Sequence, residues 1–300
     1  AGFFHLMTHA AFKACLFLGS GSVIHAMHKV YNDSEHDPQD MRNMGGLKAK
    51  MPLTFWTFLI ATLALAGIPF TSGFLSKDAI LAGSLAFGLF EHPRHILLPV
   101  LGFGAAGLTA FYMFRLIFMT FYGTPKDGKV VQLAHESPRT MTVPLIILAV
   151  LSLWFWFSPN PFGEGWFHQL VQKPESAAVE ALAVPVEPLE VAEDAAVRAA
   201  GGAHADAAHR AHYPAMVLSI VIAVTGILLA YRRYYDRRAE TIAWEADLIR
   251  RSAFLRALHN KWYFDELYEA TAIRAVLAVR MALNWFDTWV IDGLVNGSAT

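Results

Sequence analysis

Residues Leu53 to Phe90 read LTFWTFLIATLALAGIPFTSGFLSKDAILAGSLAFGLF. This apolar segment is far longer than the roughly 20 residues that cross ~30 Å of hydrocarbon as one straight helix. It is interrupted between Gly67 and Gly73, where Pro69 removes a backbone donor and the glycines loosen the backbone. The segment therefore predicts either two helices or one helix that is broken at residues 67–73.

The distribution of Lys and Arg discriminates between these two readings. If residues 53–90 cross the membrane once, fourteen Lys and Arg side chains fall in the loops on one side and four on the other; if they cross twice, the counts are ten and eight. Positive charge collects on the cytoplasmic side of membrane proteins, so one crossing by a broken helix is favoured, with residues 158–212 outside. The other stretches long enough to span a bilayer are 3–24, 96–122, 141–157 and 213–231.

The composition is that of a membrane protein. Hydrophobic residues make up 55% of the chain and charged residues 16%, against about 25% charged residues in a soluble domain. We therefore expect an all-α membrane protein, a transmembrane helix bundle that contains the broken helix. The net charge of −1 argues against a nucleic-acid partner, and the single Cys15 argues against a disulfide framework or a thiolate metal site. The sequence begins inside an apolar segment, as a fragment would.

Three ionisable residues recur every fourth position in the first apolar stretch: His5, His9 and Lys13. Side chains at this spacing stack about 6 Å apart on one face of a helix. A charge at bilayer depth costs at least ~2.5–3.5 kcal/mol, so such residues usually face water or a partner and carry function. Lys77 follows the helix break, where irregular backbone normally lines a cavity. We therefore predict that His5, His9 and Lys13 form a proton wire and that Lys13 and Lys77 are exchangeable proton carriers, although Lys77 could instead reach the headgroups or pair with Asp78.

We assign residues 1–157 to the transmembrane bundle. The later segment 174–212 is rich in Ala, Glu, Val and Pro, which predicts a mobile, partly helical linker. Its histidines His204, His209 and His212 lack further ligands, so a solvated loop is favoured over a metal site. We expect an extramembrane loop over residues 158–212 and a transmembrane helix over 213–235. A basic connector over 236–259 and a lateral amphipathic helix over 260–296 follow.

The last of these parts cannot cross a bilayer comfortably, because its longest uncharged run around the middle is Ala275–Val279. A helical wheel separates an apolar side from a polar side, which is typical of a helix lying along an interface. Such a helix could brace neighbouring subunits or only anchor the chain. The apolar side holds Phe264, Leu267, Tyr268, Ala275, Ala278, Val279, Ala282, Trp285, Phe286 and Trp289, and the polar side holds Asp265, Glu269, Arg280, Asn284, Asp287 and Thr288.

Several of these stretches resemble the antiporter-like membrane subunits of respiratory complex I, an NADH-quinone oxidoreductase. The likeness is specific over residues 3–80 and weaker to about residue 296, where the amphipathic stretch is similar to the lateral helix of the most distal of these subunits. The matching motifs are FHLMTHAAFKA from Phe4, GSVIH from Gly21, QDMRNMGGL from Gln39 and AGIPFTSGFLSKD from Ala66.

The resemblance implies a bundle of inverted repeats with discontinuous helices, of which this chain holds roughly the C-terminal half. It implies that His5, His9 and Lys13 link a central lysine to Lys77 along a hydrated axis, and that protons are translocated while quinone is reduced elsewhere. It also implies a multi-pass protein of the cell inner membrane, with the lipid bilayer and other membrane subunits as partners, above all antiporter-like neighbours reached through residues 260–296.

The chain departs from the family pattern in three ways: the half with the glutamate–lysine pair is absent, no final anchor follows Asn296, and the loop Lys29–Pro38 looks extended. No phosphate loop, Cys cluster or quinone-pocket signature is present, so we expect no cofactor and no metal on this polypeptide. The alternatives are a subunit of a multisubunit Na+/H+ antiporter or membrane-bound hydrogenase, and a structural clamp whose polar stripe is vestigial.

Overall fold

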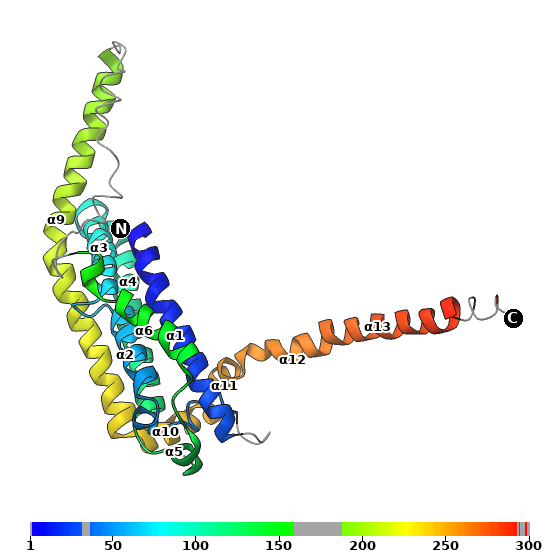
Figure 1. The fold of residues 1–300 in the computed structure, drawn as a ribbon. Coiled ribbons are helices and arrows are strands. Elements are labelled where there is room, and N and C mark those ends of the chain that lie inside the picture. The colour runs from blue at the N-terminus through cyan, green and yellow to red at the C-terminus, as the bar shows by residue number, and fades with distance from the viewer. Residues whose placement is uncertain are drawn as a thin grey trace. The chain divides into compact units, whose positions relative to one another are not determined.

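The computed structural model describes residues 2–31, 37–125, 127–158, 188–292, 294 and 298. These residues contain helices and no strand apart from one isolated bridge between Thr71 and Leu153. The chain divides into two units, residues 1–237 and 238–300. The long helices of the first unit run side by side as a bundle (Figure 1) and are α1 (Gly2–Val30), α2 (Pro52–Ala66), α3 (Ser72–Ala86), α4 (Leu97–Phe121), α6 (Arg139–Leu151) and α9 (Pro188–Tyr231).

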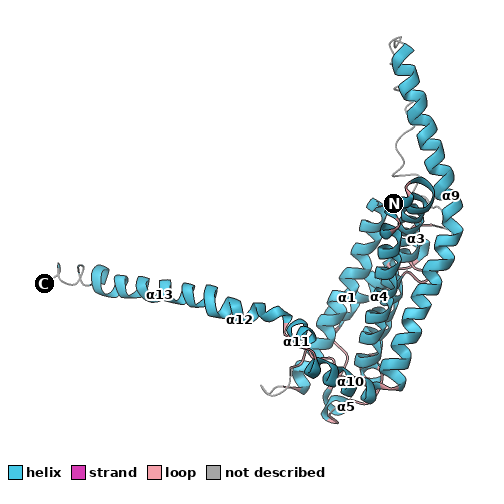
Figure 2. Ribbon diagram, turned by 180° about the vertical axis from the view of Figure 1, so that it is seen from behind, coloured by secondary structure: helices cyan, strands magenta, loops and turns pink. Residues whose placement is uncertain are grey.

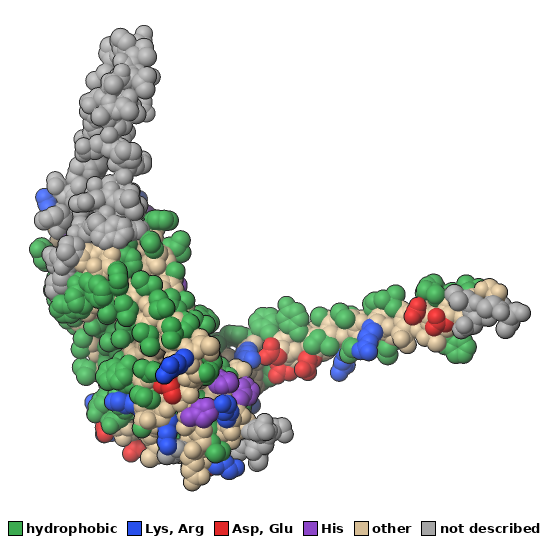
Figure 3. All heavy atoms as spheres, viewed as in Figure 1, with side chains coloured by type: hydrophobic (Ala, Val, Ile, Leu, Met, Phe, Trp, Pro, Cys, Tyr) green, Lys and Arg blue, Asp and Glu red, His purple; other side chains and the backbone are tan. Residues whose placement is uncertain are grey.

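The described helices confirm an all-α membrane protein. Four of them are long and apolar enough to cross a bilayer, Gly2–Val30, Ser72–Phe90, Pro93–Phe121 and Arg210–Asp236, and α2 and α6 are shorter apolar helices. Apolar side chains cover the flanks of the bundle, and charged side chains gather at the end that carries α5 (Figure 3). The short elements of this unit are η1 (Leu47–Ala49), η2 (Phe87–Glu91), η3 (Pro93–His95), α5 (Lys129–Leu133), η4 (Trp154–Trp156) and η5 (Arg232–Asp236).

The predicted interruption of the long apolar segment is confirmed, and it is one broken helix. The helix α2 ends at Ala66 and is capped by Gly67, whose φ of 75° is left-handed, and the Ile68 N–H donates to the Leu63 carbonyl at 3.1 Å. This is the Schellman arrangement that glycine favours at helix ends. The hydroxyl of Thr71 then caps α3 by accepting from the Phe74 N–H at 3.3 Å. In Figure 1, α3 continues along the bundle from the end of α2.

The helix α6 ends at this break instead of spanning residues 141–157 as expected. Its last residue is Leu151, and the Ser152 hydroxyl donates to the Leu148 carbonyl at 2.7 Å. The Ser72 N–H donates to the Ser152 carbonyl at 2.9 Å, beside the bridge between Thr71 and Leu153. The backbone between α2 and α3 therefore receives a hydrogen-bonding partner from the end of α6.

A side chain from the loop between α4 and α6 caps the start of α2. Glu136 accepts hydrogen bonds from the Leu53 N–H at 2.7 Å, the Thr54 N–H at 3.3 Å and the Thr54 hydroxyl at 2.6 Å. Ser22 of α1 joins this group, with its hydroxyl 2.9 Å from that of Thr54 and 2.7 Å from that of Ser137. A carboxylate at this position satisfies helix donors that lack intrahelical partners and complements the positive end of the helix dipole.

We expect Glu136→Ala to lower the free energy of unfolding by about 1–2 kcal/mol, because a capping carboxylate at a helix N-terminus is removed. Glu136→Gln should cost less, since the amide oxygen still accepts from the Leu53 and Thr54 N–H groups. Thermal unfolding of the purified protein in detergent measures both changes. Equal stability of Glu136→Ala and the wild type would contradict this role for Glu136.

The core of the first unit lies among α1, α2, α4 and α6, where Phe12, Met27, Phe55, Ile117 and Phe121 are almost fully buried. A second cluster joins α3 and α4 to α9 through Leu81, Phe103, Ala106 and Ala215, among others. The helix α9 begins at Pro188, so residues 188–212 of the expected extramembrane loop form one helix with the span that follows. Residues 159–187 of that loop lie outside the described residues.

The second unit consists of helical segments (Figure 2). Three consecutive residues with positive φ, Lys261 to Tyr263, separate its first helices from a helical run over residues 264–291. The predicted amphipathic helix therefore begins at Phe264 instead of Asn260. Its apolar side chains are exposed in this unit, Trp285 and Trp289 among them. The elements are α10 (Arg238–Arg251), α11 (Ala253–His259), η6 (Lys261–Tyr263), α12 (Phe264–Tyr268), η7 (Glu269–Ile273), α13 (Arg274–Phe286) and η8 (Asp287–Ile291).

Candidate functional site: ionisable residues at the helix break

The three predicted residues of α1 lie on one face of this helix and are half-buried. The rings of His5 and His9 have their centroids 5.7 Å apart. The ammonium group of Lys13 lies 5.8 Å from the centroid of the Phe17 ring, one turn further along the helix. Among the described residues no hydrogen bond joins Lys13 to His9. The helical spacing thus brings the two histidines together and leaves Lys13 near them without direct contact.

A hydroxyl pair connects this stripe to the broken helix. Nδ1 of His5 is 2.9 Å from the hydroxyl of Ser76 on α3, and the Ser76 hydroxyl is 2.8 Å from that of Thr8 on α1. Both hydroxyl residues are buried, and the Thr8 hydroxyl also lies 3.1 Å from the His5 carbonyl that accepts from it. Ser76 directly precedes Lys77, so the hydrogen bond of His5 reaches the turn of α3 that bears the lysine. The sequence analysis did not identify Thr8 and Ser76 as site residues. The one feature in the sequence that could have indicated them is that each carries a hydroxyl next to a predicted relay residue.

Lys77 is held inside the bundle by the end of α2. Its ammonium group donates to the carbonyl of Leu65 at 3.3 Å. Carbonyls in the last turn of a helix lack intrahelical partners and carry the negative end of the helix dipole, so they favour a cation there. A Cβ added to Gly67 would lie 3.2 Å from Cδ of Lys77, which shows how closely the break approaches this side chain. Lys77 is therefore partnered by backbone freed at the break.

The neighbouring Asp78 faces α9 and has no ion pair with Lys77 among the described residues. Its Oδ2 atom is 3.4 Å from Nε2 of His212. The carboxylate is buried, and its Oδ1 atom has no hydrogen-bond partner. Sequence reasoning placed His212 in a loop and considered Asp78 only as a local partner of Lys77. The pair between α3 and α9 is a feature that only the packing of the helices creates.

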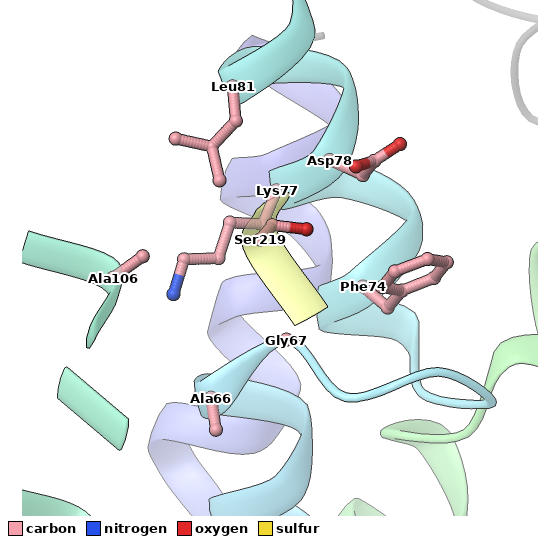
Figure 4. Close-up of a pocket in the computed structure, with 8 residues that line it drawn as sticks. All are labelled: Ala66, Gly67, Phe74, Lys77, Asp78, Leu81, Ala106 and Ser219. Atoms are coloured by element: carbon pink, nitrogen blue, oxygen red, sulfur yellow. The ribbon is translucent and has the colours of Figure 1, made fainter. Parts of the chain in front are cut away.

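A small cavity lies beside the helix break, with Lys77 and Asp78 among its lining residues. It is lined by residues of α2, α3, α4 and α9, including Ala66, Ala106 and Ser219 (Figure 4). The centre of a water-sized sphere can occupy about 10 Å³ of this cavity. This is close to the smallest volume that holds one water molecule. The polar residues among those that line it are Lys77, Asp78 and Ser219.

Of the three histidines in the 174–212 segment, His212 has a described side chain and it contacts Asp78. The side chains of His204 and His209 lie outside the described residues. Within the described part of the chain, no three His, Cys, Asp or Glu side chains are grouped as metal ligands would be. Imidazole, hydroxyl and amine groups can each donate and accept a proton, and of these residues His5, Ser76 and Thr8 lie within hydrogen-bond distance of one another.

The chain is similar to membrane subunits of quinone oxidoreductases. Residues 1–109 match the family described as NADH:quinone oxidoreductase/Mrp antiporter, TM. Over 99% of its length the chain is 39% identical to the NAD(P)H-quinone oxidoreductase chain 5 proteins of Picosynechococcus sp. and Synechocystis sp., covering 42% and 44% of them. It is 35% identical to NADH-quinone oxidoreductase subunit L of Mycobacterium tuberculosis over 99% of the chain and 40% of that protein. The chain spans less than half the length of these curated relatives.

Proposed function

We propose that the chain belongs to the NADH:quinone oxidoreductase/Mrp antiporter transmembrane family, which its residues 1–109 match, and that it is part of a proton-translocating membrane subunit of a respiratory NADH:quinone oxidoreductase. Protons move along His5, His9, Lys13 and Lys77 while other subunits reduce quinone. The supporting observation is the 2.9 Å contact between His5 and Ser76, which joins the stripe on α1 to the half-helix that bears Lys77. Proton transfer between two groups requires that they lie within hydrogen-bond distance, as His5 and Ser76 do.

Other subunits of the complex carry out the redox chemistry. The flavin, iron–sulfur and nicotinamide sites belong to other subunits, and this chain lies in the cell inner membrane without a cofactor of its own. The three relatives are subunits of quinone oxidoreductases, which favours this function over that of a Na+/H+ antiporter or hydrogenase subunit. In the remaining alternative, a structural clamp, the polar residues of α1 and α3 carry no protons.

Substitution of Lys77 separates the relay from the clamp. In membrane vesicles that contain the assembled oxidoreductase, Lys77→Ala should lower NADH-driven proton uptake by about tenfold or more, because proton transfer by a positioned group contributes factors of this size. Assembly is checked by native gel electrophoresis, and proton uptake by quenching of a ΔpH-sensitive dye. Normal proton uptake by an assembled Lys77→Ala complex would refute the relay and leave the clamp.

The amphipathic helical run over residues 264–291 is proposed to contact neighbouring antiporter-like subunits at the bilayer interface. The support is its composition: large apolar side chains, including Trp285 and Trp289, are exposed on it, and tryptophan is suited to the headgroup boundary. Apolar surface of this extent on a helix marks an interface with protein or lipid.

Ending the chain after Lys261 should weaken assembly while leaving the fold of residues 1–237 intact. The expected result is a loss of the intact complex on native gels, by about half or more, because the exposed aromatic side chains no longer bury apolar surface. Full assembly and thermal stability of the shortened protein would contradict a bracing role for this helix.

A further inference from the structure

Lys48 of η1 lies in a group of aromatic rings where α2 begins and α4 ends. Its ammonium group is 4.7 Å from the centroid of the Tyr122 ring, 4.9 Å from that of Phe55 and 6.0 Å from that of Trp56. It also donates a hydrogen bond to the Tyr122 hydroxyl at 3.1 Å. An ammonium group has three N–H donors, so this contact leaves donors of Lys48 for a further ligand. The rings hold the cation in place by cation–π attraction and do not neutralise its charge.

The charge of Lys48 has no carboxylate partner within the described part of the chain, and the side chain is exposed. Two other cations in the loops at this end of the bundle are paired: Arg42 with Asp40 at 2.8 Å, and Lys129 with Asp127 at 3.8 Å. The positive charge of Lys48 is therefore uncompensated by the residues that the structure describes. An anion from outside the chain can supply the missing partner.

Trp56 offers a second hydrogen-bond donor beside Lys48. Its side chain is 56% exposed, and its ring packs edge-on against that of Phe55, with the centroids 5.1 Å apart. Among the described residues nothing accepts from its indole N–H, whereas the indole N–H of Trp156 donates to the Val150 carbonyl. An indole ring with an apolar body and an available N–H is suited to the boundary between acyl chains and lipid headgroups.

The depth of this aromatic group matches that boundary. Tyr122 directly follows the last residue of the candidate span Pro93–Phe121, and α2 begins at Pro52. The ring of Tyr235, at the end of the candidate span Arg210–Asp236, has its centroid 5.7 Å from that of Tyr122. Charged side chains gather at this end of the bundle (Figure 3), and the distribution of Lys and Arg predicts that it faces the cytoplasm. The aromatic group therefore lies at the level of the headgroups.

We propose that Lys48 and Trp56 bind the headgroup of an anionic phospholipid of the cytoplasmic leaflet. The ammonium group of Lys48 donates to a phosphate oxygen, and the indole N–H of Trp56 donates to a phosphate or ester oxygen of the same lipid. The exposed face of the indole ring contacts the first carbons of an acyl chain. Zwitterionic lipids also carry a phosphate, but their ammonium group is repelled by the uncompensated charge of Lys48, so an anionic headgroup is favoured.

The test uses the assembled oxidoreductase in phosphatidylcholine vesicles with a rising fraction of phosphatidylglycerol that carries a photoactivatable diazirine near its glycerol. After illumination and digestion with trypsin, mass spectrometry measures the label on the peptide of residues 51–77, which contains Trp56. Lys48→Gln should raise the lipid fraction that gives half-maximal labelling by about fivefold, because one basic residue at the surface is lost. The matched control is Lys129→Gln, which removes an exposed lysine already paired with Asp127 and should label as the wild type does.

Two further variants distinguish lipid binding from a purely structural role of Lys48. Lys48→Arg keeps the charge, so half-maximal labelling should stay within about twofold of the wild-type fraction. Trp56→Phe keeps an aromatic ring against Phe55 but loses the indole N–H, so that fraction should rise by about threefold, as expected for one hydrogen bond. A phosphatidylcholine with the same diazirine serves as the second probe, and it should label the wild type and Lys48→Gln alike.

Three results would overturn this proposal. The first is labelling of Lys48→Gln by phosphatidylglycerol at the wild-type fraction. The second is an equal loss of labelling with both probes, which would mean that Lys48 only holds the local fold. The third is wild-type labelling of Trp56→Phe, which also decides the matter if Lys48→Gln does not assemble. The measurement reports lipid binding and not proton movement, so its outcome is independent of the relay.

Discussion

Lys77→Arg is expected to stop proton translocation as completely as Lys77→Ala does, with translocation at about a tenth of the wild-type rate or less. Arginine keeps a positive charge near the Leu65 carbonyl, which lies 3.3 Å from the lysine ammonium in the structure. The guanidinium group, however, does not release its proton at any pH that a protein experiences. A relay that needs Lys77 to alternate between two protonation states therefore fails, although the charge is present.

The arginine variant separates two roles that the alanine variant removes together. If Lys77 only neutralises the end of α2, arginine substitutes for it and translocation persists. The control is Lys129→Arg, at the exposed lysine that begins α5, which should translocate protons normally. Proton uptake and NADH oxidation are measured in the same vesicles. Wild-type uptake in the Lys77→Arg complex would show that position 77 requires a charge and not a transferable proton.

Gly73→Ala should be the most destabilising single methyl addition in the broken helix. A Cβ at Gly73 would overlap the carbonyl oxygen of Ala64, well inside the van der Waals distance. That carbonyl accepts from the Gly67 N–H at 3.1 Å and so belongs to the end of α2, where backbone cannot move without opening the turn. We expect a loss of about 3 kcal/mol or more in the free energy of unfolding, or failure to assemble.

Gly83→Ala is the matched control, because Gly83 lies in the same helix α3 and a Cβ there meets nothing within 4 Å. Alanine in an open helical position stabilises by about 0.5–1 kcal/mol relative to glycine. The two variants should therefore shift the midpoint of thermal unfolding in opposite directions. If Gly73→Ala is as stable as Gly83→Ala, then α3 does not pack against the end of α2 as described.

The features that could be predicted from sequence are those that a short stretch of chain determines. The break at residues 67–73 follows from local chemistry, since Gly67 takes a left-handed φ and Pro69 has no N–H to continue the helix. The proximity of the His5 and His9 rings follows from the helical period alone. The start of the amphipathic helix was misplaced, because the positive φ values at Lys261–Tyr263 occur at residue types that rarely adopt them.

Contacts between distant residues were decided by the tertiary structure. Adjacent helical side chains point about 100° apart, so Lys77 and Asp78 do not form an ion pair with each other. Lys77 contacts the end of α2, and Asp78 contacts His212 on α9. The link from His5 to Ser76 depends on how α1 packs against α3. Sequence thus determined which residues are ionisable and which helix faces they share, because helical geometry is local. Packing alone determined their partners, because partners on separate helices are set by the whole bundle and not by spacing along the chain.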